Sequence, residues 1–341
     1  MSLSGKNWSS ICTTLLKSSA DKIDFKERFV AHRGANNDAP GNTLPHLPEN
    51  TIHSLREAYA VGAQYVECDI HKTADGQLIV LHDDTLERTA RFNPKLATTL
   101  SQNHFLSIQK SKVNTLDYRS EVSQVDVGCY ESFLDEKYRG TTISLLEKFL
   151  VELQNFPQRK LVIELKAGDV TIVKELGKLI KRCVTEFKLQ TNQLVFISFD
   201  FNLIKHSKEN LPGFKHFMLT TSKPSDDDVR PDPDAPGKQI GIYYRINNKD
   251  DLNNYIKIAK HANLDGIDAE YDAHLMDEDF VQRIHDGGLL SAIWTYHEDD
   301  TLEMAKHMLA IGADLINTNQ PERIFAELNK DIQANQSKKL C

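Results

Sequence analysis

Several features that mark common protein classes are missing from this sequence of 341 residues. It has no run of 18 apolar residues, and its first 27 residues mix Lys, Asp, Ser and Thr, so we expect no transmembrane helix, no secretory signal and a cytoplasmic location. Its five cysteines form no CxxC pair, which argues against a structural zinc and against a disulfide framework. The net charge is -8 with Lys and Arg scattered, so nucleic acid is not an expected partner.

The glycine-rich GxGxxG loop of dinucleotide-binding proteins is also missing. A chain of this length, with 40% hydrophobic residues, can fold as one barrel-sized domain or as two smaller domains. An open, doubly wound α/β sheet therefore stays an alternative, although its usual phosphate loop is not there.

Strand-like and helix-like segments alternate along most of the chain. Eight units in βα order, with one extra strand that returns through a hairpin at Asp75-Gly76, predict a TIM (β/α)8 barrel. The active site of such a barrel lies at the carboxyl ends of its strands. The predicted helices are 50–61, 143–156, 170–187, 201–210, 252–262, 280–285 and 302–309, and the predicted strands are 28–31, 66–70, 77–81, 161–165, 194–198, 216–219, 266–268, 289–294 and 314–317.

The remaining segments predict the domain organisation. We expect an N-terminal extension at 1–27, the barrel at 28–328 and a C-terminal tail at 329–341. The polar stretch at about 85–126 has no sustained period, so it predicts a small insertion after the hairpin of the second strand. Residues 222–237 hold four prolines and five aspartates, which predicts an extended, mobile loop. A calcium-binding loop is the alternative there, but the spacing does not fit an EF-hand.

Two histidines close apolar, strand-like runs, and each stands beside a charged residue. His32 ends the first strand and His82 ends the hairpin strand. A single histidine of this kind is more often only a hydrogen-bonding group at the end of a strand. A histidine titrates near neutral pH, so a pair of them can also donate and accept the protons of a hydrolytic reaction.

Carboxylates lie on the strands between and after the histidines. The pleat places Glu67 and Asp69 on one face of their strand, and Glu164 stands on a later strand. Such oxygen ligands suit one divalent cation, Mg²⁺ or Ca²⁺, with Mn²⁺ as a third candidate. Glu67 and Asp69 could instead form a solvated strand face, but the neighbouring Tyr65 and Val66 favour a packed strand.

Six short motifs that contain these residues occur in a specific order. They are His32-Arg33-Gly34, Pro48-Glu49-Asn50-Thr51, Glu67-Cys68-Asp69, Thr73-Ala74-Asp75-Gly76, His82-Asp83 and Glu164-Leu165-Lys166. Each motif is weak alone, but the ordered set, from about residue 28 to 328, resembles the glycerophosphodiester phosphodiesterase family. The resemblance implies a TIM barrel that hydrolyses glycerophosphodiesters, with metal help, to sn-glycerol 3-phosphate and an alcohol. It also implies that His32 and His82 are the general acid and base.

The cations in these motifs suit a phosphodiester. Arg33 can form a fork of hydrogen bonds to phosphate oxygens, and Lys166 adds a point charge, so both are candidate phosphate-binding residues. The sequence leaves open which histidine is the base, and whether water or a substrate hydroxyl attacks the phosphorus.

Other candidates come from the resemblance and keep their alternatives. Glu49 is assigned to the site as a metal ligand or as a partner of Arg33 or substrate, but Pro48-Glu49-Asn50 could be only a helix entry with Asn50 as N-cap. Trp294 is assigned to the pocket wall beside the alcohol, but it could be barrel core. We expect Ser198 and Phe199 to be packing or rim residues. The histidines that we expect to be solvated are His46, His53, His71 and His104.

Three positions depart from the family pattern. Residues 35–47 make the first connection longer and could form a small lid over the metal. Asn319 replaces the usual Asp, and Tyr296-His297 replace smaller residues after Trp294. All three changes fall near the predicted mouth, so they bear on specificity and remove no proposed ligand or catalytic group.

Two rival functions remain. A lysophospholipase D would apply the same chemistry to a single-chain lipid, and a non-catalytic protein would only bind phosphodiesters. The first interpretation, glycerophosphodiester hydrolysis, requires a small-molecule glycerophosphodiester as partner. The sequence does not predict an oligomeric state.

Overall fold

The computed structural model describes residues 24–39, 41–44, 46–130, 136–166, 168–222, 229–231, 239–241 and 244–340. Most of the predicted N-terminal extension and most of the predicted loop at 222–237 lie outside these residues. Of that loop and its continuation, β9 (Val229–Pro231) and β10 (Gln239–Gly241) are described and pair as an antiparallel ribbon.

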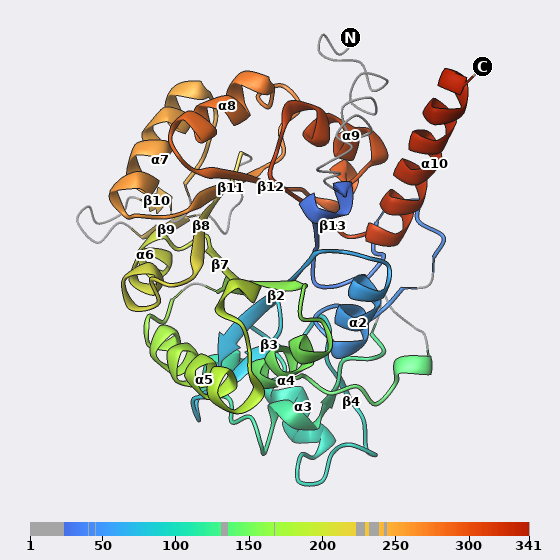
Figure 1. The fold of residues 1–341 in the computed structure, drawn as a ribbon. Helices are drawn as coiled ribbons and strands as arrows, with labels where there is room; N and C mark the ends of the chain where they lie inside the picture. Colours follow the sequence, from blue (N-terminus) through green and yellow to red (C-terminus); the bar gives the residue numbers. More distant parts are fainter. Residues whose placement is uncertain are drawn as a thin grey trace.

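Among the described residues, eight parallel strands close into a barrel, and helices surround it (Figure 1). Closure comes from the pairing of β1 with both β2 and β13. The predicted TIM barrel is therefore confirmed. The barrel strands are β1 (Phe29–Ala31), β2 (Tyr65–Lys72), β6 (Lys160–Leu165), β7 (Leu194–Ser198), β8 (Lys215–Thr220), β11 (Gly266–Glu270), β12 (Leu290–Trp294) and β13 (Leu315–Thr318).

Amphipathic helices cover the outside of the barrel. In α5 the buried residues Ile172, Leu176, Ile180 and Cys183 recur at helical spacing, so one stripe faces the strands. The sequence did not predict the long helix α10, which follows the last strand. Its residues were assigned instead to the end of the barrel and to a C-terminal tail. The helices are α2 (Ile52–Ala60), α4 (Leu146–Glu152), α5 (Thr171–Phe187), α6 (Phe201–Asn210), α7 (Lys249–His261), α8 (Glu278–Asp286), α9 (Leu302–Ile311) and α10 (Pro321–Leu340).

In the part of the chain that the structure describes, none of these helices has the length and apolar character needed to cross a bilayer. Short 3-10 helices fill several connections. They are η1 (Phe25–Arg28), η2 (Val113–Thr115), η3 (Val122–Gln124), η4 (Glu136–Tyr138), η5 (Leu153–Asn155), η6 (Thr191–Gln193) and η8 (His297–Asp299).

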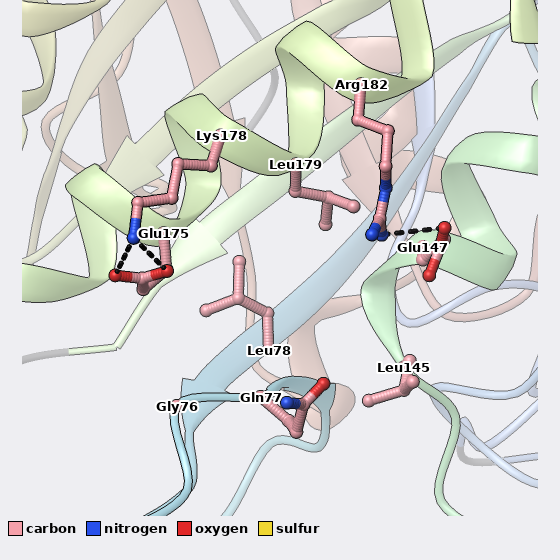
Figure 2. A pocket seen from close by; sticks show the side chains of 9 residues that line it. All are labelled: Gly76, Gln77, Leu78, Leu145, Glu147, Glu175, Lys178, Leu179 and Arg182. Atoms are coloured by element: carbon pink, nitrogen blue, oxygen red, sulfur yellow. Dashed lines mark hydrogen bonds and ion pairs between the residues drawn. The ribbon is translucent and has the colours of Figure 1, made fainter. Parts of the chain in front are cut away.

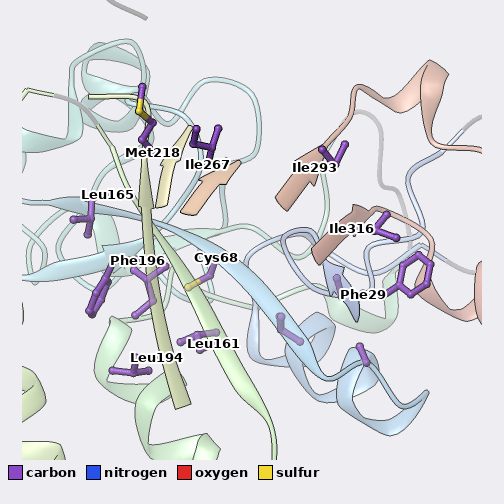
Figure 3. Packing of buried hydrophobic residues seen from close by; sticks show 14 of the residues in the cluster. Phe29, Cys68, Leu161, Leu165, Leu194, Phe196, Met218, Ile267, Ile293 and Ile316 are labelled. Atoms are coloured by element: carbon purple, nitrogen blue, oxygen red, sulfur yellow. The ribbon is translucent and has the colours of Figure 1, made fainter. Parts of the chain in front are cut away.

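Alternate residues of the barrel strands point to opposite sides. Cys68, Phe196 and Ile267 point outward and belong to the large buried cluster against the helices (Figure 3). Val162 and Val195 belong to a second cluster inside the barrel. Glu67 and Asp69 share one face of β2, as predicted, and since they alternate with its outward residues, that face points inward. Phe196 is fully buried, so its replacement by Ala should cost about 3–5 kcal/mol of stability. Burial of such outward side chains against the helices fixes which face of each strand points outward.

Strand β2 extends beyond the barrel, and its last residues lead into the insertion. Its first residues pair with β1, while Ile70 to Lys72 pair with β3 (Leu78–Val80) in an antiparallel hairpin. Gly76 in the hairpin turn has φ 79°, which a glycine adopts without strain. The predicted hairpin is thus present.

The insertion has its own small core, which we call the satellite core. It contains the buried side chains of Leu86, Phe105 and Val125 and is closed by Ile79 of β3. The core extends to Ile143, beyond the predicted segment of about 85–126. Its regular elements are β4 (Arg91–Phe92), α3 (Gln102–Ile108) and β5 (Val125–Asp126), and β4 pairs with β5.

Candidate active site

A tight turn at the end of β1 places the first pair of candidate residues. Arg33 and Gly34 have φ values of 54° and 87°, and a Cβ on Gly34 would lie 2.5–2.6 Å from atoms of Ser54 in α2. Only glycine fits so close to that helix. The turn therefore holds His32 and Arg33 at the carboxyl end of the barrel.

Three carboxylates lie beside this turn. Glu67 and Asp69 of β2 and Glu164 of β6 are at most 7% exposed, and one possible ligand atom from each lies within 4.8 Å of the others. Burial, together with the Asp69 and Glu164 charges, raises the pKa of Glu67 well above its usual value. Burial also raises the pKa of Glu164 to about 7, although Lys166 opposes it. The carboxylates thus repel one another unless a cation offsets their charge.

Two side-chain cations partly offset this repulsion. Nζ of Lys166 lies 2.7 Å from Oδ1 of Asp69 and 2.8 Å from Oε1 of Glu164. The Arg33 backbone N–H donates to Oε2 of Glu67 at 2.9 Å, and its Nε lies 3.6 Å from Oδ2 of Asp69. Burial alone would raise the pKa of Asp69, but Lys166 and the neighbouring cations hold it well below the usual range.

The donor set fits a divalent cation. Oε1 of Glu67 is buried and has no hydrogen-bond partner among the described residues. Three converging carboxylates with one unsatisfied oxygen are the hard ligands that Mg²⁺ and Ca²⁺ prefer. Glu67, Asp69 and Glu164 could therefore hold such an ion.

Asn50 is a site residue that sequence reasoning placed incorrectly. It is not the N-cap of α2, because Thr51 accepts the capping bond from Ser54 N. Asn50 instead has φ 56°, donates from Nδ2 to Oδ2 of Asp69 at 2.8 Å and accepts from the Asp69 backbone N at 3.2 Å. Asparagine tolerates this left-handed backbone better than most residues. It fixes the orientation of the Asp69 carboxylate.

His82 is held from two sides. Its Nδ1 lies 2.7 Å from Oδ1 of Asp83, whose carboxylate is bound by Arg88. Nε2 of His71 lies 3.0 Å from the His82 carbonyl oxygen. The expectation that His71 is simply solvated is therefore wrong, because it is half-buried and fixes the backbone at His82. Burial and then Lys166 lower the pKa of His82 to about 4.

His32 is held by an uncharged group. Its Nδ1 lies 2.8 Å from Oδ1 of Asn319. Asn319 is held in turn by Asp300, which accepts from the Asn319 backbone N at 2.6 Å and from its Nδ2 at 3.4 Å. Burial and Arg33 lower the pKa of His32 to about 3, and the charge of His82 contributes, so the two rings share one electrostatic environment. Sequence reasoning did not identify Asp300.

Glu49 lies outside the group of three carboxylates. Its Oε1 accepts from Nη1 of Arg33 at 3.2 Å, and both of its oxygens accept from Arg88 at 2.7 and 2.8 Å. Although burial opposes it, Arg33 and Arg88 lower the pKa of Glu49 to about 2. Of the roles open in the sequence, the geometry favours that of a partner of Arg33.

Aromatic side chains line the opposite side of the mouth. The Trp294 indole N–H donates to the Thr220 carbonyl at 2.9 Å, and its ring meets Phe199 and Tyr296 edge-on at 5.6 and 5.2 Å. Ser198 is turned away, since its Oγ donates to the Leu165 carbonyl. This aromatic wall offers an apolar surface to one side of a ligand.

The first connection, 35–47, contacts the His32 side of the mouth in its described residues. Asn36 donates from Nδ2 to the His32 carbonyl at 3.3 Å, and Asn37 donates from its backbone N to the Asn319 carbonyl at 2.9 Å. Whether this segment covers Glu67, Asp69 and Glu164 stays a prediction. Of the four histidines expected to be solvated, His53 and His104 are exposed and His46 is half-buried.

A hollow on the outside of the barrel is a separate feature. It lies between the β2–β3 turn, α4 and α5, and Leu78, Leu145 and Leu179 form its apolar part (Figure 2). The cations at its rim are already paired, Lys178 with Glu175 and Arg182 with Glu147. None of its lining residues belongs to the carboxylate and histidine cluster.

Comparison with known proteins agrees with this geometry. Residues 32–323 match the model of the glycerophosphoryl diester phosphodiesterase family. The Bacillus subtilis protein YhdW, provisionally named a glycerophosphodiester phosphodiesterase, is 27% identical over 301 residues, 88% of this chain and 97% of its own. A glycerophosphodiester phosphodiesterase of Caldanaerobacter subterraneus is 28% identical over 195 residues, 57% of this chain and 67% of its own.

The fold is also found in solved structures. A phosphodiesterase of Oleispira antarctica, solved with its product sn-glycerol-3-phosphate, superposes with a TM-score of 0.61 at 19% identity, over 89% of this chain and 96% of that protein. The family model covers most of the barrel and both histidines. The chain therefore belongs to the glycerophosphoryl diester phosphodiesterase family.

Proposed function

We propose that this protein hydrolyses glycerophosphodiesters to sn-glycerol 3-phosphate and an alcohol. The observation that carries the proposal is the meeting of two histidines, two cations and three buried carboxylates at the carboxyl ends of the barrel strands. Family membership and the product bound in the Oleispira antarctica phosphodiesterase support the same substrate class.

One divalent cation, Mg²⁺, Ca²⁺ or Mn²⁺, would be held by Glu67, Asp69 and Glu164. When bound, it would neutralise carboxylate and phosphate charge and polarise the phosphorus centre as a Lewis acid. Lys166 already contacts Asp69 and Glu164, and Nε of Arg33 lies 3.6 Å from Oδ2 of Asp69. Both cations are placed to bind phosphate oxygens and to stabilise the negative charge that grows in the transition state.

The partners of the two histidines suggest how protons move. Because the Asn319 amide is oriented by Asp300, its Oδ1 accepts a hydrogen bond from His32 Nδ1–H, which leaves Nε2 of His32 as the basic nitrogen. His82 faces the Asp83 carboxylate, which opposes the lowering of its pKa by burial and Lys166, so its pKa of about 4 stays above that of His32, about 3. We therefore assign His32 to remove the proton of the nucleophile and His82 to protonate the leaving alcohol.

The aromatic wall supports a second candidate. Phe199, Trp294 and Tyr296 could accept an acyl chain, which would make lysophospholipids substrates of the same site. This activity would be that of a lysophospholipase D. It differs from the first candidate only in the group beside the wall.

A substrate panel tests these proposals. The purified protein, dialysed against EDTA, is assayed on glycerophosphocholine and lysophosphatidylcholine with no metal, Mg²⁺, Ca²⁺ or Mn²⁺. We expect release of glycerol phosphate from glycerophosphocholine, restored only by a divalent ion and reduced about 100-fold or more in Glu67→Gln. Activity that survives EDTA would contradict the metal proposal, and faster turnover of the lysolipid would favour the second candidate. Binding of glycerophosphocholine without turnover under every metal would favour a non-catalytic role.

A further inference from the structure

Arg88 joins the insertion to the candidate active site. Its Nε and Nη2 donate to the two carboxylate oxygens of Asp83 at 2.8 and 2.9 Å. Its Nη1 and Nη2 donate to the two oxygens of Glu49 at 2.8 and 2.7 Å. A planar guanidinium can bind two carboxylates in this forked manner, whereas an ammonium cannot. Arg88 therefore fixes two acidic side chains from different parts of the chain relative to each other.

Each of these carboxylates holds a residue of the proposed site. Oδ1 of Asp83 lies 2.7 Å from Nδ1 of His82. Oε1 of Glu49 accepts from Nη1 of Arg33 at 3.2 Å. A continuous series of contacts thus leads from the proposed phosphate-binding arginine, through Arg88, to the histidine assigned to the leaving group.

The backbone of Arg88 is anchored by the satellite core. Leu86 and Ala90, two residues to either side, are 0% and 1% exposed, and Leu86 N donates to the Gln109 carbonyl at 3.0 Å. The side chain of Arg88 is still 41% exposed. The segment is therefore held firmly by the insertion, while the guanidinium reaches the mouth from the solvent side.

We propose that Arg88 is a positioning residue of this enzyme, and that the insertion acts in catalysis through it. The proposal rests on the proposed function. With both of its oxygens held, the Asp83 carboxylate cannot rotate away from His82, and Glu49 likewise keeps the Arg33 guanidinium in place. A half-exposed ion pair contributes little to stability, so the contribution of Arg88 should appear in rate rather than in folding.

Kinetics of Arg88→Ala and Arg88→Lys test this role. We expect kcat/KM of Arg88→Ala on glycerophosphocholine to fall about 30-fold, through a lower kcat and a higher KM. Small displacements of reacting and binding groups are costly in rate. Arg88→Lys should recover at most about threefold, because it restores charge but not the fork. Guanidinium ion at about 20 mM should restore Arg88→Ala about fivefold or more, because the vacated position is open to solvent.

Arg56→Ala is the matched control. Arg56 forms the same kind of fork, with Nε and Nη2 both at 2.8 Å from Glu152, but it lies on the outer side of α2. Its substitution should leave kcat and KM unchanged with or without guanidinium. Near-normal kinetics of Arg88→Ala, or full recovery in Arg88→Lys, would overturn the proposal. A loss that guanidinium does not restore would also overturn it, because Arg88 would then serve only folding.

A signal that does not depend on activity separates this proposal from the proposed function. In protein labelled with ¹⁵N-histidine, the Nδ1 proton of His82 should be shifted downfield by Asp83 and identified by its loss in His82→Ala. The signal should weaken or disappear in Arg88→Ala and persist in Arg56→Ala. A wild-type protein that cleaves no diester would contradict the proposed function alone, whereas an unchanged signal in Arg88→Ala would contradict the positioning role alone.

Discussion

His32 and His82 face the same carboxylates, but different parts of the molecule hold them. His32 follows β1 and is bound by the amide of Asn319, which follows β13 and is 1% exposed. His82 follows β3 and is bound by Asp83, whose carboxylate is held by Arg88 of the insertion. The barrel side of the site thus uses a buried neutral group, and the insertion side uses charged groups that are partly in contact with solvent.

This difference suggests that the barrel side holds the general base and the insertion side holds the general acid. An uncharged amide beside His32 fixes the ring and favours its protonated form less than a carboxylate would, which suits a base. A carboxylate beside His82 partly offsets the lowering of its pKa by burial and Lys166, so His82 is protonated more readily than His32, which suits the acid of the pair. The histidine environments therefore differ in charge, and each of the following experiments changes one side while leaving the other as a reference.

Loss of either imidazole should give the largest effect. We expect His32→Ala and His82→Ala to reduce kcat on glycerophosphocholine by about 10² to 10⁴-fold, the usual contribution of a general acid or base. With a glycerophosphodiester whose alcohol is p-nitrophenol, the loss in His82→Ala should shrink at least about tenfold, because this leaving group needs no proton. The loss in His32→Ala should stay the same.

His104→Ala serves as the control, since this exposed histidine pairs with Glu121 in the insertion. If both active-site variants responded alike to the better leaving group, the assignment of acid and base would be wrong. Detection of a cyclic glycerol phosphate in the wild-type reaction would show that a substrate hydroxyl, rather than water, makes the first attack.

Making the two sides alike should have an intermediate effect. In Asn319→Asp a carboxylate oxygen would replace the Nδ2 donor that now lies 3.4 Å from Oδ2 of Asp300. Two carboxylates at this distance repel each other, and His32 would gain a charged partner. We expect kcat/KM at pH 7 to fall about tenfold.

The double variant Asn319→Asp with Asp300→Asn is the test of that cause. It keeps one carboxylate and one amide but exchanges their positions, so most of the lost activity should return. A double variant that is no better than Asn319→Asp would contradict the explanation by repulsion, because the single variant would then fail for another reason.

The barrel was predictable from the sequence because its signals are local. The period of two in β2 is enough to place Glu67 and Asp69 on the inner face, and the hairpin is marked by Asp75-Gly76. Recognition of the ordered motifs added roles for the histidines, and the structure brings those residues together. Glu49 stands close to them but binds arginines.

The supporting residues were not predictable, because no local pattern joins them to their partners. Arg88 is 39 positions from Glu49, and Asp300 is 19 positions from Asn319. Asn50 resembled a helix cap because Asn is common in both roles, and only the fold shows that it binds Asp69. Long-range polar contacts of this kind depend on the closed barrel and on the docked insertion.

The smallest effect should be on the pH dependence of stability. Burial raises the pKa of Asp300 to about 6, although hydrogen bonds from Asn319 and Thr318 oppose it. The folded state therefore keeps a proton that the unfolded state has released, and the stability contributed by Asp300 is lost as the pH rises through about 6. Relative to Asp300→Asn, the wild type should lose about 1 to 1.5 kcal/mol of unfolding free energy between pH 5 and pH 7.5, measured with urea.

On the insertion side, the stability contributed by Asp83 should not change with pH in this interval. Although burial opposes it, His82 and Arg88 hold the pKa of Asp83 well below its usual range, so Asp83 stays ionised in both states over this pH interval. Its stabilising contribution is lost only as the pH falls below the ordinary range of an aspartate. The difference between the wild type and Asp83→Asn should accordingly stay constant from pH 5 to pH 7.5. The unfolding free energies of Asp300→Asn and Asp83→Asn, each relative to the wild type, should therefore depend differently on pH. If they depended on pH equally, Asp300 would be as fully ionised as Asp83. The two sides would then not differ in charge, and the basis for assigning the base to His32 would be lost.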